Sequence, residues 1–442
     1  MKQPTPHARA VVTIARVHGR AVWSSAGLPT LEVELTLSDG AHGRAIAQSG
    51  LSGGHTDTPA PGESAFDSHR RRVAAAIGFI DRSLGAALHG RPALQQAEAD
   101  ALLRACWRDG GLAHAHTAAV STALAAACAA SAGVAPWAYL MGDPAGARLP
   151  LPAIEIVSGG AAADFRADIQ DIMVVCPGAG SYTAALDVAA QVYQRVRGQW
   201  ARRGWNAGVG EKGGLWPAYE SVEQALDLVS NALHASGLAP GRDIGLALDC
   251  AADTFHRHGN YHLQDRPGPL DGDAMFELVQ RWLTDYPILS IEDPFASCDL
   301  APYARLQRAL GDRVQIMGDD LHDSAAPAIA AASELPALCN ATLLKPAKAG
   351  TLTDLVAARD AARANGWGVA LAGRSGDSED ILAMHLAVGL GIGQFKIGAL
   401  ARSERAAKYN EGLRIAEQLP PSAFAAHAEL RTGSGTPGAR AG

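Results

Sequence analysis

Three acidic side chains stand directly after short apolar runs in the second half of the chain. Asp249 follows IGLAL, Glu292 follows ILSI and Asp319 follows VQIMG. If these runs are strands of a β/α barrel, their carboxyl ends meet at one face and bring the three side chains together. Converging carboxylates repel one another unless a cation neutralises them, and oxygen ligands without cysteine or histidine favour Mg²⁺. The alternative for any single residue of this kind is a cap on the following helix.

Two lysines occupy similar positions. Lys345 follows ATLL, and Lys396 follows the strand-like run GIGQF. A lysine close to other cations and away from water has a lowered pKa and can act as a base, whereas a charged lysine holds an anion. Spacing does not decide between these two uses, and a lysine that points to solvent is the common alternative.

These side chains belong to a stretch in which strand and helix patterns alternate. After Leu149, short apolar runs, each followed by a helical pattern, occur at 172–175, 243–248, 288–291, 315–317, 341–344 and 368–371. Such repetition is typical of a parallel β/α barrel or of an open α/β sheet, and the number of units favours the barrel. We predict an α/β fold with the barrel over residues 148–431.

The first part of the chain has a different pattern of apolar and polar residues. Residues 11–22, 30–37 and 41–46 alternate apolar and polar side chains between turn residues, which predicts an antiparallel meander. Helical periodicity follows at 68–89, 94–109 and 117–131. The sequence therefore predicts an α+β capping domain over residues 1–140. The Gly-rich residues 432–442 are expected to form a disordered tail.

Composition excludes several classes of protein. With 48% hydrophobic and 19% charged residues, the chain reads as a soluble globular protein, and a formal charge of -7 argues against nucleic-acid binding. Six widely spaced cysteines without a CxxC pair indicate neither a zinc site nor a disulfide framework. Neither a secretion signal nor a membrane span is expected, so we predict a cytoplasmic protein.

Several motifs resemble those of the enolase family over nearly the whole chain. They are GLPTLEVELTLSDG (27–40), SGLSGG (49–54), SIEDPF (290–295), GDDL (318–321), LLKPAKAGTLT (343–353), RSGDSED (374–380) and GQFKIGALARSERAAKYNEGLRI (393–415). The resemblance implies an enolase-type modified β/α barrel with an N-terminal capping domain. It also implies a homodimer or a higher homo-oligomer.

The resemblance further implies roles for single residues. The three acidic residues Asp249, Glu292 and Asp319 would hold a first Mg²⁺, and Ser52 would reach a second Mg²⁺ when its loop closes. Arg374 and Ser375 match the phosphate-binding pair of the family.

Two lysines and a glutamine complete the implied site. Lys345 would remove the proton next to the substrate carboxylate, and Lys396 would stabilise the enolate that results. Gln170 matches a glutamine that contacts the substrate.

The chain departs from the family where a proton must reach the leaving hydroxide. The motif GDEGG reads GEKGG here, so that Lys212 stands where the family has its acidic glutamate, and Asp171 stands for a second, longer glutamate. Glu211 is a candidate substitute acid. Lys212 would itself donate a proton if burial lowered its pKa toward 7. Two family histidines are also missing, with Ala162 and Gly373 in their places.

Three functions remain open at this point. The first is a lyase acting on a phosphorylated or phosphonylated three-carbon acid, with dehydration of a 2-phosphoglycerate-like acid to phosphoenolpyruvate as its simplest form. The second is group transfer in phosphonate metabolism, as in the enolase-like enzymes that make carboxyphosphonoenolpyruvate. The third is a non-catalytic scaffold, which the retained lysines and acidic residues argue against. Exchange of glutamate for lysine and loss of two imidazoles favour a larger or more anionic ligand than 2-phosphoglycerate.

Overall fold

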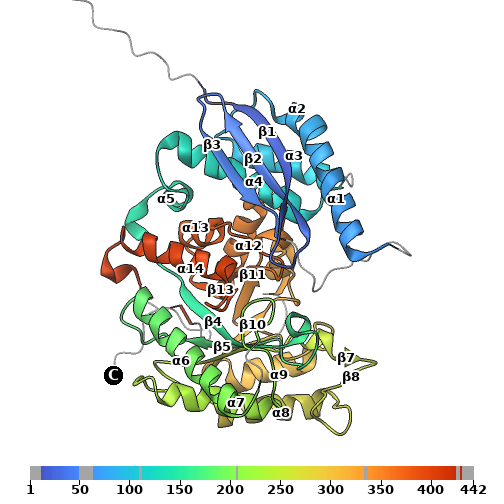
Figure 1. Ribbon diagram of the computed structural model, residues 1–442, viewed down its shortest axis with the longest axis vertical. Helices are drawn as coiled ribbons and strands as arrows, with labels where there is room; N and C mark the ends of the chain where they lie inside the picture. The colour runs from blue at the N-terminus through green and yellow to red at the C-terminus, as the bar shows by residue number, and fades with distance from the viewer. Residues whose placement is uncertain are drawn as a thin grey trace, which may run out of the picture.

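The computed structural model describes residues 11–48, 63–108, 112–205, 208–332, 337–424 and 429–430, which form two packed parts (Figure 1). The smaller part carries an antiparallel sheet of β1 (Ile14–Trp23), β2 (Pro29–Leu37) and β3 (His42–Ile46). Its helices are α1 (Ala65–Phe79), α2 (Gly85–Leu88), α3 (Gln96–Arg108), α4 (His114–Ala132) and α5 (Pro136–Met141). The predicted helix over 68–89 is interrupted by a π-helical turn at Ile80–Leu84.

Helix α4 is the core helix of the smaller part. It lies so close to β3 that a Cβ on Gly43 would come within 2.2 Å of the backbone nitrogen of Ala127, and only glycine fits there. By length and composition alone α4 could cross a membrane, but 72% of the stretch in question is buried inside the fold. Its apolar composition is therefore explained by packing.

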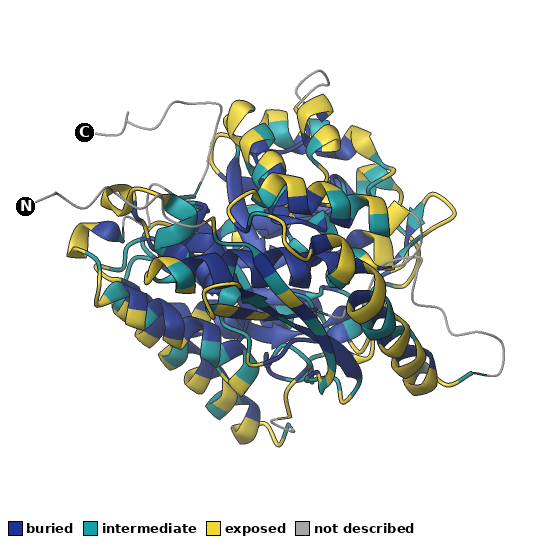
Figure 2. Ribbon diagram, turned by 90° about the horizontal axis from the view of Figure 1, so that it is seen from above, coloured by how far each residue is buried: buried dark blue, intermediate teal, exposed yellow. Residues whose placement is uncertain are grey.

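The described part of the larger region forms a closed barrel of eight strands in the order β10-β11-β12-β13-β4-β5-β6-β9. The strands are β4 (Leu151–Ser158), β5 (Asp171–Val175), β6 (Gly245–Asp249), β9 (Ile288–Glu292), β10 (Gln315–Gly318), β11 (Ala341–Leu344), β12 (Gly368–Ala372) and β13 (Gln394–Gly398). Their residues are nearly all buried, because helices cover the outside and side chains fill the inside. Figure 2 shows buried residues in the middle of the molecule and exposed residues on the outer faces of the helices.

Nine helices of the described residues surround the barrel, and four of them begin at a side-chain cap. They are α6 (Tyr182–Arg202), α7 (Val222–His234), α8 (Gly272–Asp285), α9 (Leu300–Leu310), α10 (Ala326–Ala331), α11 (Pro346–Ala349), α12 (Leu352–Ala364), α13 (Leu382–Gly389) and α14 (Ser403–Ala416). Side chains of Ser181, Ser221, Asp271 and Thr351 accept backbone N–H groups at the first turns of α6, α7, α8 and α12. A small hairpin of β7 (His256–Arg257) and β8 (Asn260–Tyr261) follows β6.

Strand β5 runs antiparallel to both neighbours, β4 and β6. The expectation of a fully parallel barrel is therefore wrong at this strand, although the modified barrel implied by the family resemblance is confirmed. The reversal matters for the site because it brings the first residue of β5, Asp171, beside Asp249, the last residue of β6. The apolar runs identified in the sequence analysis did not include strand β4.

Hydrogen bonds hold the two parts together near the carboxyl ends of the strands. Asp100 of α3 accepts from the hydroxyls of Ser121 at 2.7 Å and of Thr353, in α12, at 2.6 Å. The backbone nitrogen of Ile46 in β3 donates to Asp380 at 2.8 Å. The chain passes from α5 to β4 through a 3₁₀ turn at Pro144–Gly146. The predicted domain limits stay predictions, and the predicted tail lies outside the described residues.

Candidate active site

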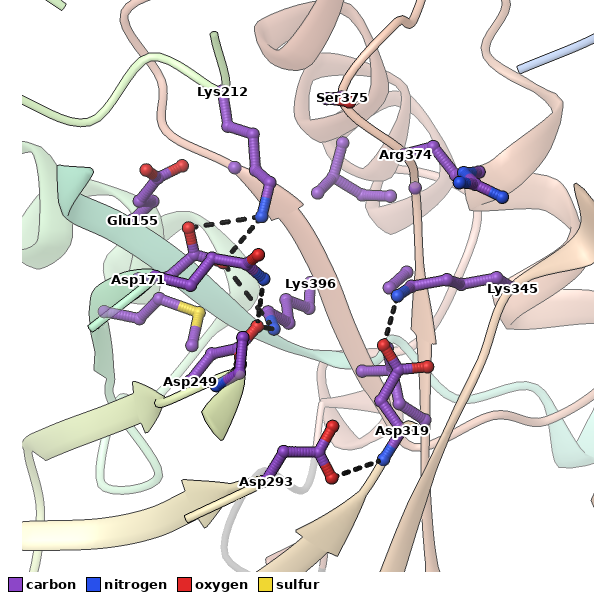
Figure 3. Close-up of a pocket in the computed structure, with 18 of the residues that line it drawn as sticks. Glu155, Asp171, Lys212, Asp249, Asp293, Asp319, Lys345, Arg374, Ser375 and Lys396 are labelled. Atoms are coloured by element: carbon purple, nitrogen blue, oxygen red, sulfur yellow. Dashed lines mark hydrogen bonds and ion pairs between the residues drawn. The ribbon is translucent and has the colours of Figure 1, made fainter. Parts of the chain in front are cut away.

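A cavity opens at the carboxyl ends of the barrel strands, and charged side chains from many strands point into it (Figure 3). Its lining includes nine residues that the sequence singles out: Gln170, Asp171, Lys212, Asp249, Asp319, Lys345, Arg374, Ser375 and Lys396. Glu292 lies next to this lining through its ion pair with Lys396. Ser52 lies outside the described residues.

The three predicted metal ligands come from three neighbouring strands. Asp249 and Glu292 are the last residues of β6 and β9 and stand opposite each other in the ladder, and Asp319 directly follows β10. All three side chains are buried. The convergence expected from the strand ends is thus present in the barrel, and the metal-binding role stays a prediction.

The tightest group of carboxylates includes a residue that the sequence analysis missed. Oxygens of Glu292, Asp293 and Asp319 all lie within 4.8 Å of one another, whereas Asp249 is held on Lys396. Asp293 has a positive φ of 41° and accepts the backbone N–H groups of Asp319 and Asp320 at 3.1 and 3.0 Å. The adjacent acidic pair in SIEDPF was the signal that could have pointed to it.

Electrostatics at these carboxylates favours a cation. Burial raises the pKa of Glu292 well above its usual range, and the negative charge of Asp249 adds to this. Burial and Asp319 raise the pKa of Asp293 in the same way. Glu292 Oε1 and Asp319 Oδ1 are buried and accept no hydrogen bond from the described residues. Buried carboxylate oxygens that lack a hydrogen-bond donor fit Mg²⁺, a hard cation that prefers oxygen ligands.

The two predicted catalytic lysines approach these carboxylates from different strands. Lys396 of β13 places Nζ 2.5 Å from Asp249 Oδ2 and 2.7 Å from Glu292 Oε2. Burial opposes its charge, but Asp249 and Glu292 outweigh burial and raise its pKa. Lys345, directly after β11, bonds to Asp319 through Nζ. Each ammonium is thus fixed by residues predicted to bind the metal.

A further lysine lies beside Lys345. Lys348 lines the cavity and places Nζ 2.6 Å from Asp323 and 3.5 Å from Asp319. Burial opposes its charge, yet Asp319 raises its pKa. The second lysine of KPAK was the only hint of it in the sequence.

Gln170 and Asp171 reach the cavity because β5 is reversed. Gln170 Nε2 donates to Asp249 Oδ2 at 2.7 Å, and Asp171 is buried with its carboxylate 3.6 Å from Lys396 Nζ. Burial would raise the pKa of Asp171, but the ammonium groups of Lys212 and Lys396 lower it. Asp171 is therefore charged.

Lys212 points into the cavity and forms an ion pair with Asp171. Its Nζ lies 2.8 and 3.2 Å from the two carboxylate oxygens. Burial would lower the pKa of Lys212, but Asp171 reverses the effect and raises it. Lys212 would donate a proton near neutral pH only if its pKa were lowered, and its pKa is raised instead.

Glu211 is not among the residues that line the cavity. It is hydrogen-bonded to Ser375, and burial raises its pKa while Lys212 opposes the rise. Gly373 lines the cavity, but Ala162 does not and instead accepts the backbone N–H of Glu211 at 2.9 Å. Loss of the two imidazoles was expected to enlarge the cavity at both positions. Only Gly373 lines the described cavity, so space is gained there and not at Ala162.

The predicted phosphate pair is positioned by a buried arginine. Arg405 of α14 donates to the carbonyl oxygens of Arg374 at 2.9 Å and Ser375 at 2.5 Å, and to Asp377 at 3.1 Å. Its side chain is 1% exposed. The loop after β12 is thus held from beneath, so that Arg374 and Ser375 line the cavity.

Comparison with known proteins gives matches over both parts. The family model described as Enolase, N-terminal domain, matches residues 14–140, and the one described as Enolase, C-terminal TIM barrel domain, matches residues 146–432. Enolase 1 of Methylococcus capsulatus is 37% identical over 417 residues, which cover 93% of this chain and 98% of that protein. Enolase of Tropheryma whipplei is 36% identical over 427 residues, covering 93% and 96%.

Proposed function

Because the chain belongs to the enolase family, we propose that this enolase-like lyase removes the proton next to the carboxylate of a 2-phosphoglycerate-like acid. One observation carries the proposal. Two ammonium groups, Lys345 and Lys396, face the same buried carboxylate cluster from different strands. This pairing supports proton removal at one side of a bound acid and stabilisation of negative charge at the other.

The proposed roles follow from the contacts. Arg374 and Ser375 bind the phosphate or phosphonate, since Arg374 offers a planar fork of donors. Lys345 gives up its bond to Asp319 and, when neutral, takes the proton. Lys396 remains charged and lies beside the carboxylate on which negative charge develops. Gln170 orients Asp249 and the substrate.

Magnesium is the proposed cofactor, held by Asp249, Glu292 and Asp319, with Asp293 supporting the last of these. The ion would supply positive charge for the substrate carboxylate and its enolate. Lys396 Nζ contacts both Asp249 and Glu292, so its positive charge would act beside that of the ion. We further propose that the protein works in the cytoplasm as a homodimer or a higher homo-oligomer.

The test follows the proton rather than the product. The purified full chain is incubated with Mg²⁺ and 2-phosphoglycerate in deuterated water, and deuterium at carbon 2 is followed by NMR. Phosphoenolpyruvate is measured in the same sample by its ultraviolet absorbance. Exchange with product formation supports a hydratase. Absence of both, with or without binding of the acid, would contradict the proposal and favour a scaffold.

Group transfer is the second candidate, and one observation favours it. The group at the place of the expected acid, Lys212, is tied to Asp171 with a raised pKa, so it donates poorly to a leaving hydroxide. An enolate formed here would then persist long enough to attack a second substrate, such as an activated phosphonate. Exchange at carbon 2 without phosphoenolpyruvate is the outcome expected for this candidate.

A further inference from the structure

A carboxyl group that the proposed reaction does not use lies at the wall of the cavity. Glu155 sits in the middle of β4, is 1% exposed, and lines the cavity next to Asp171 and Lys212 (Figure 3). Its Oε1 accepts from the hydroxyl of Ser158 at 2.5 Å. Its Oε2 is buried, and no N–H or ordinary hydroxyl donor of the described residues reaches it.

Glu155 has another acid as its neighbour. Glu155 and Asp171 line the cavity next to each other, and two carboxyl groups can hydrogen-bond to each other only with a proton on one of them. Lys212 and Lys396 lower the pKa of Asp171 and favour its charged form. A shared proton would therefore reside on Glu155, whose buried Oε2 has no donor among the described residues.

The surroundings of Glu155 agree with this assignment. Burial raises its pKa to about 8, and the charge of Asp171 contributes to the rise. Lys212 and Arg405 oppose it without cancelling it. The titratable and charged groups facing Glu155 from the packed elements are Asp171 of β5, Lys212 of the loop before α7, Tyr193 of α6, and Arg405 and Tyr409 of α14.

The carboxyl group of Glu155 is closely packed against the backbone. A Cβ on Gly214 would lie 2.6 Å from Glu155 Oε1, so the backbone of the 208–216 loop closes over the group only because residue 214 is glycine. The Ser158 hydroxyl also lies 3.2 Å from the carbonyl oxygen of Gly214. Glu155 is thus wedged between β4 and the loop that carries Lys212.

We propose that Glu155 is the proton-holding positioning residue of this site, which as a neutral acid donates a hydrogen bond to Asp171 and so fixes the carboxylate that holds Lys212. If Glu155 lost its proton, two buried carboxylates would compete for the one ammonium of Lys212 and would repel a bound anion. The effect on turnover rests on the proposed function, whereas the protonation of Glu155 does not.

The first experiment observes the proton directly. Infrared spectra of the ligand-free full chain are recorded between about pH 5 and pH 10, the range that brackets the raised pKa. Other buried carboxyl groups, such as Glu292 and Asp293, also have raised pKa values, so each variant is compared with wild type in difference spectra. The difference between wild type and Glu155→Gln should contain one carbonyl stretch that disappears near pH 8. That stretch should remain in Asp168→Asn, which removes a carboxyl group outside the cavity. A difference spectrum without a band that titrates near pH 8 would overturn the proposal.

The second experiment asks whether the proton positions the site. Wild-type exchange should decline above pH 8, as Glu155 loses its proton. Glutamine keeps the shape and offers an N–H to Asp171, so Glu155→Gln should keep carbon-2 exchange within about threefold and should lack this decline. Glu155→Leu keeps neither hydrogen bond and should exchange about 10- to 100-fold more slowly at every pH.

These outcomes separate the two proposals. An unchanged alkaline decline in Glu155→Gln would contradict the positioning role, as would equal losses in the Gln and Leu variants. If wild type exchanged no proton at all, the proposed function would be wrong, while the infrared titration would still decide the state of Glu155.

Discussion

The ammonium nitrogen of Lys396 lies 2.5 Å from Oδ2 of Asp249, inside the cluster of carboxylates proposed to bind the metal. The ammonium group thus neutralises part of the negative charge of these carboxylates. Binding of Mg²⁺ to Asp249 and Glu292 would exchange one cation contact for another.

This exchange predicts a specific response of stability to magnesium. Mg²⁺ should raise the melting temperature of wild type, with a gain of about 2.7 kcal/mol at a hundred times the dissociation constant. Glu292→Gln and Asp319→Asn should abolish the rise, measured by calorimetry against added Mg²⁺. Asp285→Asn, at an exposed helix end, is the control and should respond like wild type. A full response in Glu292→Gln would show that the ion binds elsewhere.

Lys345→Gln tests the proposed base. The variant should slow deuterium exchange at carbon 2 of 2-phosphoglycerate by at least about 100-fold, because the neighbouring lysine, Lys348, is held 2.6 Å from Asp323. The matched control is Lys348→Gln, since Lys348 also contacts Asp319 but is bound more closely to Asp323. Equal losses in both variants would mean that the charge around Asp319, rather than a base, is what matters.

Lys212→Met tests the ion pair at the place of the missing acid. Because Asp171 is buried and would lose its nearest cation, the variant should lose about 3 to 5 kcal/mol of the free energy of unfolding. In an Asp171→Asn background the same change should cost much less, and the difference measured in denaturant gives the coupling. Arg281→Met, on an exposed face of α8, should stay within about 0.5 kcal/mol of wild type. Additive losses would argue against the pair.

Arg405→Lys tests how the phosphate loop is held. Lysine keeps the charge opposite Asp377 but cannot donate at once to the carbonyl oxygens of Arg374 and Ser375. We expect binding of the phosphorylated acid to weaken by about tenfold in calorimetry, with a smaller change in the rate constant of exchange. Arg414→Lys on the same helix is the control, and an equal weakening there would contradict this role.

Stability should also depend on pH through Glu155. A carboxyl group whose pKa is higher in the folded chain holds its proton more tightly there, so its contribution is complete below the ordinary value of 4.5. The contribution disappears as the pH rises through about 8. The melting temperature of wild type should therefore fall relative to Glu155→Gln by about 2 °C or more between pH 5 and pH 8. A constant difference would indicate that Glu155 is already ionised at pH 5.

The sequence was sufficient for those features that depend on strand ends. Asp249, Glu292 and Asp319 could be grouped because each follows an apolar run, and Lys345 and Lys396 for the same reason. Asp171 and Lys212 entered only through family resemblance, since nothing in an apolar pattern tells the direction of a strand. The reversal of β5 depends on which neighbours it pairs with, and this is a property of the closed barrel.

Glu155 shows a different limit. A single acidic residue within LPLPAIEIVS is a visible anomaly in an apolar run, but its meaning depends on Asp171 and Lys212, which lie on other elements. Asp293 was missed because it directly follows Glu292. Neighbouring side chains of a continuing strand point to opposite faces, so Asp293 was not expected beside Glu292, but the strand ends at Glu292. Charge coupling between segments far apart in sequence is not encoded in local spacing.

The loop that carries Lys212 contributes no strand to the barrel. It joins α6 to α7 and is fastened by the Lys212 carbonyl oxygen, which accepts the N–H of Ala399 at 2.9 Å, and by a bridge from Leu215 to Val157. Asp249 and Glu292, by contrast, are part of the ladder itself. Side-chain exchange at position 212 therefore leaves every strand pairing intact. The position proposed to govern the fate of an enolate therefore lies on a loop, apart from the strand ends that carry the proposed metal ligands.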